Sequence, residues 1–238
     1  MGLGARTTDP KIDTGSHDLD SLLNHGITRS GITAVYGEAG TGKTTIALQI
    51  TRQTAMHGLK VLYVDSDRSF TQQRFQQIAG PDFGNLSELV LLFFPENFEE
   101  QQELLESLEN FVTPAVGLIV VDSISSLYRL AFSSTNESVF KLNRVLTRQL
   151  AYLSELSLSR KIACLLTSQV HARLTGHFAQ IEPVARRALF HFAKSIIRLK
   201  NTPSSNVKEC IVERDQGMGV SNGRCVLSLT DRGFMDLK

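Results

Sequence analysis

The residues best suited to chemistry in this chain form the run Gly37-Glu38-Ala39-Gly40-Thr41-Gly42-Lys43-Thr44. The run fills every fixed position of the phosphate-binding pattern G-x-x-x-x-G-K-[ST]. Glycines let successive backbone N–H groups turn toward one anion, and the helix that follows directs its positive end at the same place. The ammonium of Lys43 can reach β- and γ-phosphate oxygens, and the Thr44 hydroxyl can bind Mg²⁺. The run, extended to Thr45, therefore predicts a site for a nucleoside triphosphate and Mg²⁺.

The neighbours of this run favour the same interpretation. The stretch 31–36 before it is β-type and apolar, and the stretch 43–57 after it has helical character. A phosphate-binding loop requires this order of strand, loop and helix. The alternative is a glycine-rich turn that fits the pattern by chance.

A carboxylate follows a second apolar stretch, at Asp122 after Leu118-Ile119-Val120-Val121. In phosphate-loop enzymes an acid at such a strand end holds Mg²⁺ or one of its water ligands. An aspartate there can also serve only to cap the next helix. In combination with the phosphate loop, the sequence predicts that Asp122 and Thr44 hold the metal ion.

Two further acids follow another apolar stretch, at Asp65 and Asp67. Hydrolysis of a nucleotide needs a group that positions or deprotonates the attacking water. In extended backbone Asp65 and Asp67 share one face, so both could approach the site. The alternative is a pair of turn and cap residues that open the next helix.

Gln169 ends the apolar stretch 161–168. An amide at this strand end could donate a hydrogen bond to the γ-phosphate or accept one from the attacking water. It would then report the state of the nucleotide to the segment that follows. The alternative is a polar side chain that faces solvent.

The remaining sequence alternates apolar β-type runs with helical periodicity. Expected strands lie at 31–36, 60–65, 89–94, 117–122 and 161–168, and expected helices at 43–57, 70–79, 98–111 and 138–157. Continuously apolar strands that alternate with helices indicate a mainly parallel sheet with helices on both faces. After residue 168 strands and helices no longer alternate. The runs 194–200, 207–214 and 224–229 predict antiparallel strands that extend one edge of the sheet. The expected fold class is therefore α/β with an antiparallel C-terminal extension.

Composition excludes several classes of protein. The 238 residues, 42% of them hydrophobic and 21% charged, are typical of one large soluble domain. The chain contains no apolar run of membrane-spanning length and begins without a signal-peptide pattern, so a cytoplasmic protein is expected. Its three cysteines lack metal-type spacing, and reduced thiols are expected, although Cys210 and Cys225 could face each other across a hairpin.

Positive charge is concentrated in one segment. The net charge is +1, yet residues 171–200 contain six Lys and Arg residues against one Glu. A basic segment on a nearly neutral protein indicates a local contact with a polyanion. The alternative is an ordinary solvated face.

These features resemble the RecA-type recombinase ATPases over nearly the whole chain. The matching segments are Thr14-Gly15 with Leu19-Asp20, the phosphate loop, Tyr63-Val64-Asp65-Ser66-Asp67 with Phe70 and Arg74, Val121-Asp122-Ser123-Ile124 with Tyr128-Arg129, and Thr167-Ser168-Gln169-Val170. The tail is most similar to archaeal paralogues of these recombinases, in Pro183-Val184-Ala185, Ile197-Arg198-Leu199, Val212-Glu213-Arg214 and Leu229-Thr230-Asp231-Arg232-Gly233-Phe234. The resemblance implies a RecA-like core.

The resemblance also implies roles for the site residues. Lys43, Asp67 and Gln169 would form the catalytic set, and Arg74 would stack on the adenine of ATP. Asp67 stands where the family usually has a glutamate, which is one methylene longer. Because a catalytic base must reach its proton, we expect slow hydrolysis.

The same resemblance implies two DNA-facing loops, at 129–138 and 171–187. In the second, Arg173, Arg186 and Arg187 could neutralise backbone phosphates. Phe178 could stack on a base or simply anchor the segment. The alternative for Arg186 and Arg187 is the edge of the core or the nucleotide of a neighbouring subunit.

The expected function is that of an ATP-binding recombination accessory with weak ATPase activity, which binds single-stranded DNA and modulates a full-length recombinase. The alternatives are a recombinase that performs strand exchange itself as an ATP-dependent filament, and a RecA-fold signalling ATPase that does not bind DNA. Only about 13 residues precede the first matching segment, so we expect one domain over 1–238 without a separate N-terminal DNA-binding domain or polymerisation linker. A monomer or small homo-oligomer near the nucleoid is expected.

Overall fold

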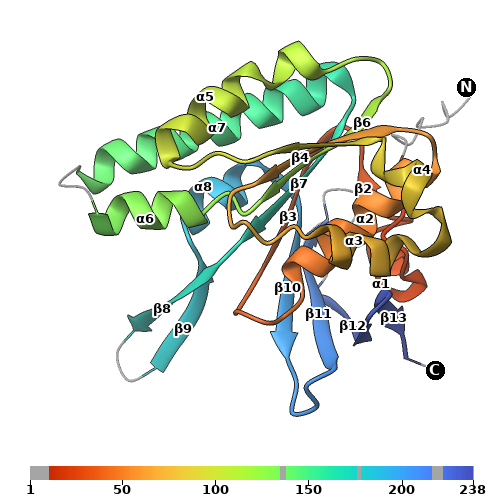
Figure 1. The fold of residues 1–238 in the computed structure, drawn as a ribbon. Helices are drawn as coiled ribbons and strands as arrows, with labels where there is room; N and C mark the ends of the chain where they lie inside the picture. The colour runs from red at the N-terminus through yellow and green to blue at the C-terminus, as the bar shows by residue number, and fades with distance from the viewer. Residues whose placement is uncertain (1–10, 135–137, 176–177, 216–221, 238) are drawn as a thin grey trace, which may run out of the picture.

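A nine-stranded mixed sheet with helices on both faces forms the centre of the molecule (Figure 1). The computed structural model describes residues 11–134, 138–175, 178–215 and 222–237, and of residues 134, 171–175 and 178–181 it describes the backbone alone. The strand order is β13-β12-β11-β10-β3-β7-β6-β4-β5. The expected fold class is confirmed.

The parallel part of the sheet contains the apolar runs of the sequence. Its strands are β3 (Gly31–Gly37), β4 (Lys60–Asp65), β5 (Val90–Phe93), β6 (Val116–Asp122) and β7 (Ala163–Ser168), and each pairs in parallel with its neighbours. Strands β3, β6 and β7 are buried along their whole length. They are apolar at nearly every position because helices cover both of their faces.

Two layers of helices cover the sheet. One layer holds α2 (Lys43–Met56), α3 (Gln72–Ala79), η1 (Gly80–Asp82) and α4 (Phe83–Ser87); the other holds α5 (Phe98–Ser107), η2 (Leu108–Phe111), α6 (Ser126–Ser134) and α7 (Val139–Arg160) (Figure 1). Successive residues of one strand belong to the two different hydrophobic cores. Val120 packs in the core beneath α2, and Val121 packs in the core beneath α7. This alternation follows from the two-residue period of a strand.

An antiparallel extension completes the sheet at the C-terminal end. β10 (Ala193–Asn201) pairs in parallel with β3 and antiparallel with β11 (Val207–Asp215), and β12 (Gly223–Thr230) and β13 (Gly233–Asp236) continue the meander. Cys210 and Cys225 lie opposite each other in the pairing of β11 with β12, and both are free thiols. The predicted facing of these two cysteines is confirmed.

The N-terminal segment packs at the same end of the molecule as this antiparallel extension. It consists of β1 (Lys11–Ile12), α1 (His17–Leu22) and β2 (Ile27–Thr28). Ser16 caps α1 by accepting a hydrogen bond from the backbone of Leu19, and its hydroxyl donates to Asp236 on β13 at 2.5 Å. The elements β1, β2, α1 and β13 were not predicted, because each is too short to show a clear period in the sequence.

The segment after Gln169 differs from its prediction. Residues 171–187 are not a loop but a hairpin of β8 (Val170–Thr175) with β9 (Phe178–Pro183), followed by α8 (Arg186–Phe192), and the hairpin projects from the body on the left of Figure 1. Val170, Ala172 and Leu174 alternate with polar residues, and this two-residue period is the signal that we missed.

The segment expected as a first loop is also largely helical. Residues 129–134 continue α6, which begins at Ser126, and residues 135–137 lie outside the described part of the chain. Leu127, Leu130 and Ala131 supply a three-to-four residue spacing, whereas the small polar residues that follow at 133–136 suggested a loop.

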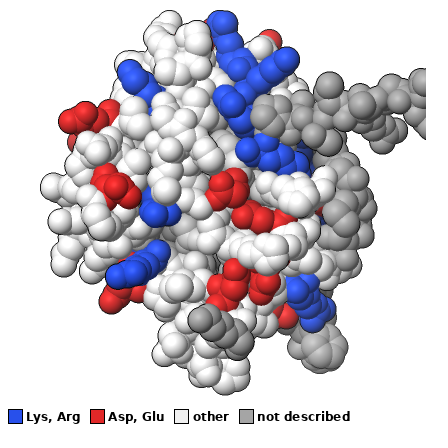
Figure 2. All heavy atoms as spheres, turned by 90° about the vertical axis from the view of Figure 1, so that its right-hand side faces the viewer, with Lys and Arg blue, Asp and Glu red and all other residues white. Residues whose placement is uncertain are grey.

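The face shown in Figure 2, the right-hand side of Figure 1, carries charges of both signs. Lys and Arg side chains gather in its upper part, and Asp and Glu side chains in its centre and lower part. The basic segment that we associated with a polyanion begins instead in the hairpin on the opposite side. Among the described residues, no helix combines the length and the apolar character that crossing a membrane requires.

Candidate functional site

The phosphate loop connects β3 to α2 at the carboxyl end of the sheet. Gly40 and Gly42 have φ values of +73° and +94°, which L-residues with a side chain rarely adopt. Gly42 is the N-cap of α2, and no side chain caps this helix end. The first N–H groups of α2 are thus left for a ligand, as an anion site requires.

Lys43 lies folded over this loop. Its ammonium donates to the carbonyl oxygens of Gly37 at 3.0 Å and Glu38 at 2.9 Å. Burial lowers the pKa of Lys43, while the negative charges of Asp122 and Asp67 act in the opposite direction. A bound anion would stabilise the charged form of Lys43, because its negative charge compensates for the hydration that the ammonium loses on burial.

A cavity of about 460 Å³ opens over the loop. Its lining includes most of the predicted nucleotide-site residues, together with Arg129 and Val170: Gly37, Ala39, Gly40, Gly42, Lys43, Thr44, Thr45, Asp67, Asp122 and Gln169. Glu38 and Thr41 belong to the same loop, where the Thr41 hydroxyl donates to the Glu38 carbonyl at 2.8 Å. The fold therefore gathers, in one place, residues that are up to 133 positions apart.

Asp122 lies at the end of β6 and is almost fully buried. Its carboxylate accepts hydrogen bonds from Thr167, from the Tyr63 hydroxyl at 3.0 Å and from the Ser69 hydroxyl at 3.2 Å. Burial raises the pKa of Asp122, and hydrogen bonds from Thr167, Thr44 and Tyr63 oppose the rise. A nearby cation would favour the charged carboxylate.

The donor set at this position fits Mg²⁺. Thr44 and Asp122 supply a hydroxyl and a carboxylate, and Ser69 bridges them, with its hydroxyl 3.3 Å from that of Thr44. Mg²⁺ prefers oxygen ligands and usually keeps several waters beside one or two protein groups and the substrate phosphates. The described part of the chain holds no group of three or more His, Cys, Asp or Glu residues that could bind a metal ion by themselves.

The structure separates the two acids that follow β4. Asp65 is buried and accepts hydrogen bonds from the backbone N–H groups of Ser69 at 3.0 Å and Phe70 at 2.9 Å, so it shapes the turn before α3. Asp67 is exposed and lines the cavity. Of the two interpretations, the turn role applies to Asp65, while Asp67 faces the site.

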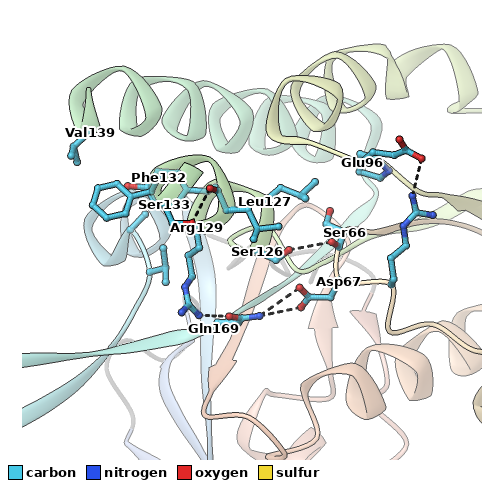
Figure 3. Close-up of a pocket in the computed structure, with 16 residues that line it drawn as sticks. Ser66, Asp67, Glu96, Ser126, Leu127, Arg129, Phe132, Ser133, Val139 and Gln169 are labelled. Atoms are coloured by element: carbon cyan, nitrogen blue, oxygen red, sulfur yellow. Dashed lines mark hydrogen bonds and ion pairs between the residues drawn. The ribbon is translucent and has the colours of Figure 1, made fainter. Parts of the chain in front are cut away.

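Gln169 bridges Asp67 to α6 (Figure 3). Its amide nitrogen lies 3.5 Å and 3.4 Å from the two carboxylate oxygens of Asp67, and its amide oxygen accepts a hydrogen bond from Arg129. Its backbone N–H donates to the Ser125 hydroxyl at 3.0 Å. Gln169 thus lies between the candidate base and the first turn of α6.

A larger cavity of about 1050 Å³ lies on the other side of these residues. It lies between α6 and the loops that follow β4 and β5, and it shares Asp67, Arg129 and Gln169 with the smaller cavity. Size alone would favour it as the ligand site. Of these two cavities, only the smaller is lined by the phosphate loop, Lys43 and Asp122, the residues suited to a nucleoside triphosphate.

Arg74 occupies the outer side of the loop helix. Its guanidinium donates to the carbonyl oxygens of Asp231 at 2.9 Å and Thr230 at 3.1 Å, and it lies 3.5 Å from the Thr45 hydroxyl. It does not line the 460 Å³ cavity. Arg74 therefore lies beside Thr45, and its stacking on the adenine of ATP stays a prediction.

The basic residues lie apart from the phosphate loop. Arg186 and Arg187 are exposed at the start of α8 and line a cavity of about 760 Å³ between α7 and α8. Arg186 lies 3.8 Å from Glu182 and 4.5 Å from the centre of the Phe190 ring. The side chains of Arg173 and Phe178 lie outside the described part of the structure.

Three residues of the site were not assigned a role from the sequence. Ser69 and Tyr63 bond the Asp122 carboxylate, and Arg129 bonds Gln169. Tyr63 lies two positions before Asp65 on the same strand, a spacing that could have indicated a shared face. Nothing local in the sequence marks Ser69 or Arg129 as neighbours of these groups.

The strand order, the phosphate loop and the acid at the end of β6 define an ATPase fold of the RecA type. A sequence profile of the Rad51 family matches residues 5–237, and the chain belongs to this family. It is homologous to the proteins called DNA repair and recombination protein RadB in several archaea, as the sequence resemblance predicted.

Two relatives show the extent of this similarity. The chain is 36% identical to RadB of Methanococcus maripaludis over 186 residues, which cover 78% of this chain and 83% of the relative. It is 32% identical to RadB of Thermococcus gammatolerans over 229 residues, 95% of this chain and 99% of the relative.

A solved structure agrees with the sequence comparison. The crystal structure of the RadB recombinase matches with a TM-score of 0.80 and 31% identity, covering 95% of this chain and all of the other chain. The chain is therefore a paralogue within the RecA-type recombinases.

Proposed function

We propose that this protein binds ATP with Mg²⁺, binds single-stranded DNA, and acts as an accessory of homologous recombination and DNA repair that modulates a full-length recombinase. Lys43, Thr44 and Asp122 would hold the triphosphate and the metal. ATP would act mainly as a conformational ligand. The name of these relatives, DNA repair and recombination protein, supports the same process for the present chain.

One observation carries the proposed link between nucleotide and DNA. The hairpin β8–β9 begins directly after Gln169 and returns to it, since the backbone N–H of Val184 donates to the Gln169 carbonyl at 3.0 Å. Both ends of this hairpin are thus attached to the residue that bonds Asp67 in the nucleotide cavity. A change at the γ-phosphate that moves Gln169 would move the hairpin with it.

The proposed DNA contact uses Arg173 of β8 and Arg186 and Arg187 at the start of α8. Exposed guanidinium groups neutralise phosphates, and the release of counterions makes such binding sensitive to salt. Arg187 is exposed, and Arg186 is exposed despite its contacts with Glu182 and Phe190.

Slow hydrolysis is part of the proposal. Asp67 is the acid that lines the nucleotide cavity beside Gln169, and its carboxylate is one methylene shorter than a glutamate. Strand exchange is the second candidate, since the relative of known structure is called the RadB recombinase; a strand-exchange recombinase would need ATP-dependent filaments.

Fluorescence anisotropy of labelled single-stranded DNA tests the proposal, with and without Mg·ATP over a salt series. We expect salt-dependent binding that ATP changes. The double variant Arg186→Ala/Arg187→Ala should bind more weakly, with the logarithmic salt slope reduced by about 0.7 for each lost phosphate contact. The matched control is Arg148→Ala/Arg160→Ala. It removes two exposed arginines of α7, which pair with Glu106 and Glu109.

Other outcomes separate the alternatives. A steep, cooperative and strictly ATP-dependent isotherm would support strand exchange by the chain itself. Absence of DNA binding under every condition, with ATP binding retained, would contradict both DNA-binding functions and leave the signalling ATPase.

A further inference from the structure

Three residues from different parts of the chain form the wall between the two cavities. Arg129 comes from α6, Gln169 from the end of β7, and Asp67 from the loop after β4, and all three line both cavities (Figure 3). Arg129 donates to the amide oxygen of Gln169, whose amide nitrogen faces the two carboxylate oxygens of Asp67.

The chemistry of an amide explains why this order matters. The two ends of a glutamine amide have nearly the same shape, but the nitrogen only donates hydrogen bonds and the oxygen only accepts them. If the Gln169 amide were reversed, its oxygen would face the carboxylate oxygens of Asp67, and two acceptors would oppose each other. Arginine carries five donors and no acceptor, so it binds the oxygen end alone.

We propose that Arg129 is a positioning residue that fixes the Gln169 amide with its nitrogen toward Asp67, and through it holds the Asp67 carboxylate in the nucleotide cavity. The inference rests on the proposed ATP hydrolysis. Arg129 would act on Asp67 through Gln169, because its hydrogen bond is with the end of the amide that faces away from Asp67.

The local structure makes Arg129 suitable for this role. Ser125 and Arg129 are four residues apart at the start of α6, and the Arg129 N–H donates to the Ser125 carbonyl at 3.1 Å. Residues at this spacing lie on the same side of a helix. The buried Ser125 hydroxyl accepts the Gln169 backbone N–H, while Arg129 binds its side-chain oxygen. The same helical turn therefore fixes the backbone and the amide of Gln169.

Steady-state ATP hydrolysis by two variants tests the proposal. Arg129→Ala removes the donor, and Arg129→Lys keeps the positive charge but not the planar fork of donors. We expect both variants to lower kcat by about 10-fold or more, with KM for ATP changed less than about 2-fold, because geometry and not substrate affinity is lost. The matched control, Arg148→Ala, removes an exposed arginine paired with Glu106 at 2.9 Å and should leave both constants unchanged.

A double-variant cycle with Gln169→Ala distinguishes positioning from a general effect of charge or folding. If Arg129 acts through Gln169, adding Arg129→Ala to Gln169→Ala should cause no further loss. Additive losses, or an unchanged or higher kcat in Arg129→Ala, would overturn the proposal.

A second readout needs no nucleotide, so it separates failure of this inference from failure of the proposed ATPase function. The Gln169 side-chain NH₂ signals, assigned by their loss in Gln169→Ala, report in ¹⁵N-resolved NMR spectra how firmly the amide is held. We expect Arg129→Ala to narrow the shift difference of the two protons and speed their exchange, and Arg148→Ala to change neither. Identical Gln169 signals with and without Arg129 would refute the positioning role even if ATP is hydrolysed.

Discussion

Gln49 on the phosphate-loop helix α2 forms a reciprocal pair of hydrogen bonds with the backbone of Phe234, 185 residues further along the chain. The Phe234 N–H donates to the Gln49 side-chain oxygen at 2.7 Å, and the Gln49 side-chain nitrogen donates to the Phe234 carbonyl at 3.2 Å. Both residues are buried. The last strand of the sheet is therefore fastened to the helix that carries Lys43.

This pair should contribute strongly to stability. Gln49→Ala leaves a buried N–H and a buried C=O without partners, and we expect the free energy of unfolding to fall by about 2–4 kcal/mol. Urea denaturation followed by circular dichroism measures the change. Gln102→Ala, which loses a partly exposed hydrogen bond to Glu106, is the control and should cost less than about 0.5 kcal/mol. Equal losses for the two variants would show that Gln49 does not fasten β13.

The phosphate loop should tolerate a side chain differently at two of its glycines. A Cβ on Gly42 would lie 2.5 Å from a ring atom of Phe234, whereas a Cβ on Gly40 would meet no atom within 4 Å. Both glycines have positive φ, so each alanine costs about 1 kcal/mol of backbone strain. Gly42→Ala should therefore lower the melting temperature further than Gly40→Ala.

The aromatic contact itself can be tested in the same experiment. Phe234→Leu removes the ring atoms that oppose the new Cβ, so the double variant Gly42→Ala/Phe234→Leu should be less unstable than the sum of its two single changes. Strict additivity would mean that the ring does not limit position 42.

Lengthening the carboxylate at Asp67 should raise the rate of ATP hydrolysis. Asp67→Glu adds one methylene to an acid that lines the cavity, and a gain of about 10-fold in kcat is expected if reach limits the base. Phosphate release under saturating Mg·ATP measures it, with Asp82→Glu at an exposed position of η1 as the control. A rate equal to or below that of the parent protein would remove Asp67 from the role of base.

ATP affinity should fall as the pH becomes alkaline. Burial lowers the pKa of Lys43 in the free protein from its usual value of 10.5, so its ammonium loses its proton earlier than an exposed lysine would. The phosphates of ATP favour the charged form, so binding takes up a proton above the lowered pKa, and the Kd must rise with pH.

Titration with a fluorescent ATP analogue between about pH 8 and pH 10 measures this dependence. Lys43→Arg remains charged over the whole interval and should show a flat profile, even if its affinity is lower. A parent profile as flat as that of Lys43→Arg would show that Lys43 does not titrate in this range.

The sequence by itself determined the local chemistry of this protein. The phosphate loop could be recognised because its pattern lies within eight consecutive residues, and Asp122 because it ends a run of apolar residues. The parallel sheet followed from the same runs, since strands covered on both faces must be apolar at nearly every position. These features depend on neighbours along the chain.

The tertiary structure decided which side chains meet. Asp65 and Asp67 are equivalent in the sequence, and only the turn before α3, in which Asp65 accepts two backbone N–H groups, leaves Asp67 as the acid that faces the cavity. The contact of Arg129 with Gln169 joins residues 40 positions apart, which no local period encodes. Hydrogen bonds between side chains act over about 3 Å in space. Such contacts exist only once the packing of the strands and helices has set the distances between residues that lie far apart along the chain.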